Sequence, residues 1–299
     1  MIKTDLHAHG LDHYDITVNR AIPLLGGKNY NGIPSPSELF QGTSLPERLL
    51  ETSFSKALHS LVCLANFDDE RAERMINQLR RLAEEKGYTV RDNTSFISID
   101  REDQTASYIR GQELETDGGH ILFVGAEKNI KSANLEETIR KAKKEYNALV
   151  LVPHSLVGNS TLMRKVIGHN RTSEERPQIK QVSLGIQELE KFKEYIDGIE
   201  IQKGKYEMAQ LEVAQKLNLP TYAASGSHRP QNILNAGVEF DTLDFSNLDN
   251  LRESIRISLR GNPRKFFTSP NPVEDFRHKA SVALAILGLK SGFLKQDRK

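Results

Sequence analysis

The chain has 299 residues, enough for one large α/β domain or two small ones, and 37% of them are hydrophobic, which suffices for a buried core. Its 41 basic and 40 acidic residues give a net charge of +1, so bulk charge provides no footprint for binding nucleic acid or membranes, although a local basic patch stays open. The single cysteine, Cys63, excludes an internal disulfide and fits a reducing compartment best.

The beginning of the chain runs from Met1 directly into a polar and β-branched segment, without the apolar core of a signal peptide. No apolar stretch is long enough for a membrane span. We therefore expect a cytoplasmic protein with no membrane partner.

Short apolar or β-branched runs alternate with longer segments of helical periodicity. The segment 69–86 is typical, because Ala72, Met75, Ile76 and Leu79 recur at helical spacing and a helix stop follows at Gly87. Strands are predicted at 2–6, 60–64, 94–98, 120–124, 148–152, 198–201 and 221–224, and helices at 46–56, 69–86, 135–146, 186–195 and 205–217. This alternation predicts parallel strands connected by crossover helices.

Two long stretches interrupt the alternation, one at about 26–42 and one at about 157–181. The first is rich in glycine and the second is polar and basic. Long loops in compact domains often serve as lids or binding segments. A last apolar helix is predicted at about 274–290, packed across a single domain that spans 1–299.

The first predicted strand leads into the motif Asp5-Leu6-His7-Ala8-His9. Side chains two positions apart on an extended segment point to the same face, so His7 and His9 can bind one ion together. A position at the end of a strand suits the carboxyl-end rim of a barrel. The motif is short, and two ordinary histidines at a strand end are the alternative.

Four later segments give this motif a context. They are Gly111-Gln112-Glu113 followed by Gly119-His120-Ile121-Leu122, then Val152-Pro153-His154, Gly198-Ile199-Glu200-Ile201, and Ser225-Gly226-Ser227-His228. With the opening Asp-Leu-His-x-His, they resemble, in the same order, the motifs of the polymerase and histidinol phosphatase (PHP) superfamily of metal-dependent phosphoesterases. The resemblance covers most of residues 1–265 and implies an α/β fold, a distorted (β/α)₇ TIM-like barrel.

The resemblance also implies a site. Its metal ligands are His7, His9, Glu113, His154 and His228, with His13 as a further candidate, and Glu113 bridges two ions. Imidazole and carboxylate ligands suit one or two divalent ions, which we expect to be Zn, Mn or Fe. The implied reaction is hydrolysis of a phosphate mono- or diester by metal-activated water, with Glu113 and Arg229 as catalytic residues. The expected partner is a small phosphorylated substrate or a nucleic-acid end.

Two positions depart from the family pattern. Phe67 stands where a histidine ligand is usual, and Gly226 stands where an aspartate ligand is usual. Neither residue can bind a metal ion through its side chain, so the site is partly degenerate. His120 is usually not a ligand in the resembling segment, and a supporting or structural role is expected for it.

Two alternatives to the enzyme remain open. One is a non-catalytic binding or assembly module that keeps the barrel and has lost the chemistry, which the two departures favour. The other is a metal-dependent hydrolase of C–N bonds, although the lysine ligand and late aspartate of such barrels are not evident in the sequence.

Overall fold

The computed structural model describes residues 1–9, 45–66, 71–93, 95–131, 134–153, 184, 186–201, 207–227, 232–261 and 265–268. The predicted loops at 26–42 and 157–181 and the predicted helix at 274–290 lie outside these residues. Among the described residues, no helix is both long and apolar enough to cross a membrane.

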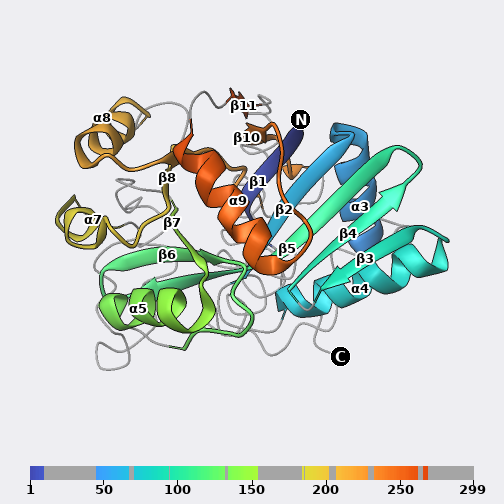
Figure 1. The fold of residues 1–299 in the computed structure, drawn as a ribbon, viewed down its shortest axis with the longest axis horizontal. Helices are drawn as coiled ribbons and strands as arrows, with labels where there is room; N and C mark the ends of the chain where they lie inside the picture. The colour runs from blue at the N-terminus through green and yellow to red at the C-terminus, as the bar shows by residue number, and fades with distance from the viewer. Residues whose placement is uncertain are drawn as a thin grey trace, which may run out of the picture.

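The described strands form one strongly curved sheet (Figure 1). Its main path runs β11-β10-β1-β2-β5-β6-β7-β8-β9, and the hairpin β3-β4 is attached to β5. The strand bounds are β1 Ile2–His9, β2 His59–Asn66, β3 Thr89–Asn93, β4 Phe96–Arg101, β5 Gln104–Thr116, β6 Gly119–Val124, β7 Leu149–Val152, β8 Gly198–Glu200, β9 Thr221–Tyr222, β10 Ala236–Phe240 and β11 Lys265–Thr268.

The barrel is nearly closed by the segment that follows β9. Ser227 forms a parallel bridge with Ala8, and the backbone N–H of Gly226 donates to the carbonyl oxygen of His7 at 2.8 Å. The other half of this edge of β1, Ile2 to Thr4, pairs with β10 in antiparallel orientation. The outcome is a mixed α/β fold built around a barrel-like sheet.

The prediction of parallel strands is confirmed for β1, β2, β7, β8 and β9 and wrong for β4 and β6. β2 pairs in parallel with both β1 and β5. β8 likewise pairs in parallel with both β7 and β9. By contrast, β4 and β6 are antiparallel to their neighbours. The two residues Asp117 and Gly118 connect Thr116 directly to Gly119, which leaves no room for a crossover helix before β6. Glu113 lies inside β5, a strand that the sequence patterns did not predict.

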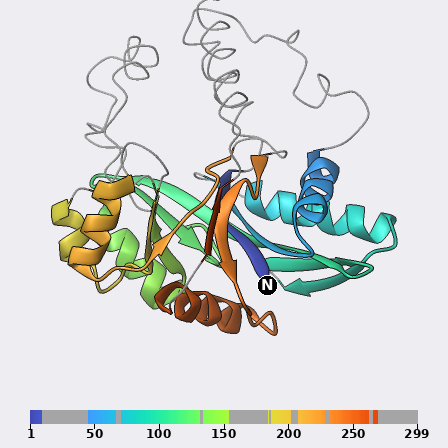
Figure 2. The same ribbon diagram turned by 90° about the horizontal axis from the view of Figure 1, so that it is seen from above.

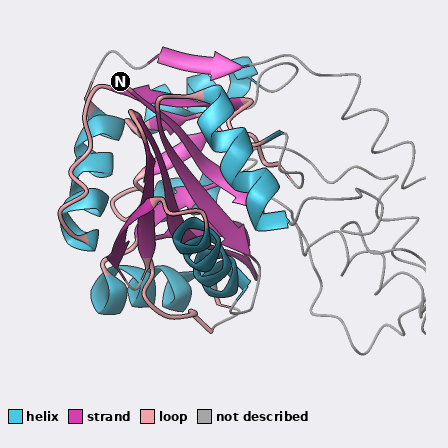
Figure 3. Ribbon diagram, turned by 90° about the vertical axis from the view of Figure 1, so that its right-hand side faces the viewer, coloured by secondary structure: helices cyan, strands magenta, loops and turns pink. Residues whose placement is uncertain are grey.

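Helices cover the outer face of the sheet (Figure 3). They are α3 Leu45–Lys56, α4 Arg71–Glu85, α5 Leu135–Tyr146, α7 Ile186–Phe192 and α8 Glu207–Leu217, and a further helix, α9 Leu248–Arg260, lies elsewhere. One apolar cluster joins α3 and α4 to β2, β4 and β5, and another joins α5, α7 and α8 to β6, β7 and β8. Successive side chains of a strand point to opposite faces of the sheet, so the same strands also contribute side chains to the interior of the barrel.

Helix α9 closes the end of the barrel at which β7 and β8 begin (Figures 1 and 2). Its apolar residues Leu251, Ile255 and Leu259 belong to the interior cluster with strand residues such as Leu149. The buried guanidinium of Arg252 donates to the carbonyl oxygens of Gly125 and Tyr146, beside the start of β7. With this end occupied, the carboxyl ends of the parallel strands are where a site can form.

Candidate functional site

Four titratable side chains from four strands meet at the carboxyl end of the barrel. Nδ1 of His7 lies 3.0 Å from Oε2 of Glu200, and Nε2 of His7 lies 3.4 Å from Oε2 of Glu113. The other oxygen of Glu113, Oε1, lies 2.8 Å from Nδ1 of His120. We call these four residues the His7 cluster.

The alternation of strand residues explains why these side chains converge. On β6, Leu122 and Val124 contribute to the interior cluster, and His120 lies two positions before Leu122 on the same face. On β8, Ile199 packs outward among the helices, so Glu200 points inward. Because β6 is antiparallel, its first residues lie at the carboxyl end of the parallel strands, and His120 joins the cluster there.

The glycine of the Gly111-Gln112-Glu113 segment has a steric role. A Cβ at position 111 would lie 2.3 Å from Sγ of Cys63, which is buried inside the barrel on β2. Gly111 thus leaves room for the thiol of Cys63 beside β5, two residues before Glu113.

Burial makes the charges of the His7 cluster interact strongly. His7 is fully buried, Glu113 and Glu200 are at most 2% exposed, and His120 is the most accessible member with 15% of its side chain exposed. Burial opposes a charge on His7, but Glu200 and Glu113 outweigh it and raise the pKa of His7 to about 10. Burial likewise opposes a charge on His120, and its hydrogen bond to Glu113 nevertheless raises the pKa of His120.

The geometry of His7 and Glu113 fits a shared metal ion. Two ligand atoms bound at about 2.05 Å to a tetrahedral Zn²⁺ are separated by roughly 3.3 Å, and Nε2 of His7 lies 3.4 Å from Oε2 of Glu113. Imidazole and carboxylate are the donors that Zn, Mn and Fe accept. No group of three or more His, Cys, Asp or Glu side chains in the described ranges is arranged to hold an ion, so an ion here would need further ligands from elsewhere in the chain.

Asp5, the first residue of the opening motif, has a different role. Its buried carboxylate accepts hydrogen bonds from the backbone N–H groups of Ser225 and Leu234 at 3.0 and 2.9 Å and from the hydroxyl of Ser225 at 2.6 Å. Burial raises the pKa of Asp5, while these donors act in the opposite direction. Asp5 therefore connects β1 to the segment that closes the barrel. The register of β1 against β2 shifts between Asp5 and Ala8, just before the end of β1.

The structure brings together two of the predicted ligands, His7 and Glu113. The side chains of the other predicted site residues lie outside the described set, namely His9, His13, His154, His228 and Arg229, as does the departure at Phe67. Gly226 is described, with a left-handed φ of +53°, and no described atom lies within 4 Å of the place where its Cβ would stand.

Sequence reasoning assigned no role to Glu200 and only a supporting role to His120. The signal for Glu200 is a carboxylate between Ile199 and Ile201 in a strand, since an acid in an apolar strand has to be compensated when it is buried. The contact of His120 with Glu113 arises from the antiparallel hairpin of β5 and β6, which brings the two side chains within hydrogen-bonding distance, and not from a local sequence motif.

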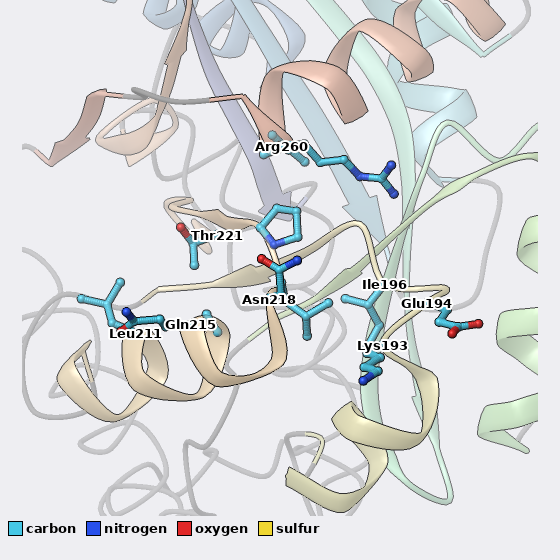
Figure 4. Close-up of a pocket in the computed structure, with 12 residues that line it drawn as sticks. Lys193, Glu194, Ile196, Leu211, Gln215, Asn218, Thr221 and Arg260 are labelled. Carbon is cyan, nitrogen blue, oxygen red and sulfur yellow. The ribbon is translucent and has the colours of Figure 1, made fainter.

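A separate cavity of about 680 Å³ lies between α7, α8 and the end of α9 (Figure 4). Lys193, Asn218, Thr221 and Arg260 give it a polar and basic lining. Thr221 begins β9, so the cavity lies toward the opposite end of the barrel from the His7 cluster. Neither His7 nor Glu113, the two predicted ligands whose side chains are described, lines it, and it does not belong to the candidate site.

No protein-family model and no curated protein matches the chain. Among solved structures, PsfC from Pseudomonas syringae PB-5123 is similar, with 13% sequence identity and a TM-score of 0.46 over 81% of this chain and 88% of that chain.

Proposed function

We propose that the protein is a metal-dependent hydrolase of phosphate mono- or diesters, built on a distorted (β/α)₇ barrel of the PHP type. The observation that carries the proposal is the convergence of Nε2 of His7 and Oε2 of Glu113, 3.4 Å apart and buried, at the carboxyl end of the strands. This is the separation of two ligands on one ion and the end of a barrel at which catalytic groups gather.

The remaining ligands of one or two Zn, Mn or Fe ions would come from His9, His154 and His228, with His13 as a further candidate. A bound divalent ion supplies Lewis-acid chemistry and brings the pKa of water toward neutrality. Glu113 is placed to act through both oxygens, because Oε2 faces His7 and Oε1 faces His120.

His120 and Arg229 complete the proposed machinery. His120 is the most exposed member of the His7 cluster, so it can exchange a proton between Glu113 and solvent. Arg229 would bind the phosphate of a small phosphorylated substrate or a nucleic-acid end through charge-assisted hydrogen bonds.

The second candidate is a non-catalytic binding or assembly module. The observation that favours it is that His7, once protonated, can donate to Glu200 and Glu113 together, so these residues stabilise one another through buried ion pairs without a metal ion. Phe67 and Gly226 in place of two usual ligands point the same way.

A hydrolysis screen separates the two candidates. The full chain is supplied with Zn²⁺, Mn²⁺ or Fe²⁺ and tested on phosphate monoesters and diesters, alongside Glu113→Gln and the matched control Glu115→Gln, an exposed residue on the same strand. The enzyme is supported if Glu113→Gln reduces the rate of hydrolysis by more than about 100-fold and Glu115→Gln leaves it unchanged. A loss of this size exceeds the one typical of a residue that contacts a metal ligand but not the metal itself. Absence of hydrolysis with every metal and ester supports the module.

A further inference from the structure

Glu200 is a buried carboxylate that contacts the ring of His7. It ends β8 between two isoleucines, and its side chain is 2% exposed. A buried ionised carboxylate is costly unless it is paired and hydrogen-bonded. The contact between its Oε2 and Nδ1 of His7, at 3.0 Å, is therefore a built feature of the barrel interior.

Both ring nitrogens of His7 face a carboxylate, but the contact of Nδ1 to Glu200, at 3.0 Å, is shorter than that of Nε2 to Glu113, at 3.4 Å, which favours a proton on Nδ1 in the neutral ring. An ionised carboxylate only accepts hydrogen bonds, so Nδ1 of His7 donates in the contact with Glu200. In the neutral ring the lone pair is then on Nε2, which is the atom that faces Glu113. The orientation of the ring is fixed as well, because Glu200 and Glu113 lie on opposite sides of it, on β8 and β5.

We propose that Glu200 is a positioning residue that holds His7 in its Nδ1–H tautomer and directs Nε2 toward an ion shared with Glu113. This inference rests on the proposed function, since it assigns a task to Glu200 only if the His7 cluster binds metal. A carboxylate on the distal nitrogen of a metal-binding histidine also makes the ligand more basic, and its removal weakens metal binding by about 10- to 100-fold.

The test compares Zn²⁺ affinity of the full chain, by competition with a chromophoric chelator, in the natural protein, Glu200→Gln and Glu194→Gln. Glu194 is an exposed glutamate near the end of α7, so its variant makes the same chemical change away from the cluster. The amide oxygen that Glu200→Gln introduces can still accept from Nδ1 of His7, which favours a folded variant. The expected result is an affinity about 10- to 100-fold weaker for Glu200→Gln and unchanged for Glu194→Gln.

Two outcomes separate the failure of this inference from the failure of the proposed function. If the natural protein binds no Zn²⁺, the proposed function fails, and the task assigned to Glu200 fails with it. If the natural protein binds Zn²⁺ and folded Glu200→Gln binds it equally well, Glu200 has only a structural role and the inference alone is overturned.

A second measurement covers the case in which Glu200→Gln does not fold. Nitrogen-15 spectra of histidine-labelled natural protein with Zn²⁺ report which nitrogen of His7 is protonated. A protonated Nδ1 with Nε2 on the metal is expected, and metal on Nδ1 would overturn the inference.

Discussion

Asp5 and Ser225 are 220 positions apart in the sequence and are joined by two hydrogen bonds, from the backbone N–H and from the hydroxyl of Ser225 to the two carboxylate oxygens of Asp5. The carboxylate also accepts from the backbone N–H of Leu234. Asp5 thus holds three donors from the segment that closes the barrel, and it stands two residues before His7. Closure of the barrel and placement of the His7 cluster depend on the same short stretch of β1.

Asp5→Asn should destabilise the fold by about 1–3 kcal/mol, because the amide nitrogen that replaces one oxygen faces a donor and leaves a buried group unpaired. The measurement is the free energy of unfolding in urea, with the exposed Asp241→Asn as the matched control. Equal stability of the two variants would contradict the role of Asp5 in closure.

Arg252→Met should cost roughly 2–5 kcal/mol, because the carbonyl oxygens of Gly125 and Tyr146 lose a buried donor. Metal affinity of the folded fraction should stay unchanged, since α9 covers the end of the barrel opposite the His7 cluster. Urea unfolding and Zn²⁺ titration check the two parts, with exposed Arg74→Met as control. A loss of affinity without a loss of stability would show that the two ends are coupled.

The metal-free protein, kept in chelator, should show a pH dependence that originates at His7. Its folded-state pKa of about 10 lies above its ordinary value of 6.5, so its stabilising contribution is complete below about pH 6.5 and declines as the pH rises toward 10. The difference in unfolding free energy between the natural protein and His7→Gln should therefore shrink over this range. A difference that is constant or grows with pH would contradict the charged arrangement of His7 between Glu113 and Glu200.

Gly226→Asp tests the missing ligand that the sequence indicates. The left-handed φ of +53° costs a side chain about 1–2 kcal/mol, and Asp and Asn tolerate it better than other residues. Gly226→Asp, alone or with Phe67→His, should raise the metal stoichiometry, whereas Gly226→Asn should carry a similar stability cost without that gain. Elemental analysis and urea unfolding measure both quantities. A folded Gly226→Asp, Phe67→His double variant with unchanged stoichiometry would mean that these positions do not correspond to the family's ligands.

Sequence patterns predicted the elements whose periodicity is local. The helix at 135–146 is confirmed at both ends, since Asn134 caps its beginning and Asn147 adopts a left-handed conformation after its end. Helix α9 was not predicted, although Leu248, Leu251, Ile255 and Leu259 have helical spacing and Asn247 is a typical N-cap.

The site residues that belong to a sequence motif could be predicted. Those that contact them from strands distant in the sequence could not. His7 and Glu113 were expected together and lie in contact. The parallel interpretation of β6 hid the proximity of His120 to Glu113, because only an antiparallel hairpin brings position 120 back beside position 113. Glu200 joins His7 across 193 positions of sequence, a relationship that local patterns do not encode.

The most direct test of the account is the metal content of the purified full chain, measured by elemental analysis in the natural protein, His7→Ala, Glu113→Gln and the control Glu115→Gln. The account predicts one or two transition-metal ions per chain in the natural protein and in Glu115→Gln, and a sharp loss in His7→Ala and Glu113→Gln because each removes a ligand. Absence of metal from the natural protein, together with no gain in melting temperature on addition of Zn²⁺ or Mn²⁺, would contradict it.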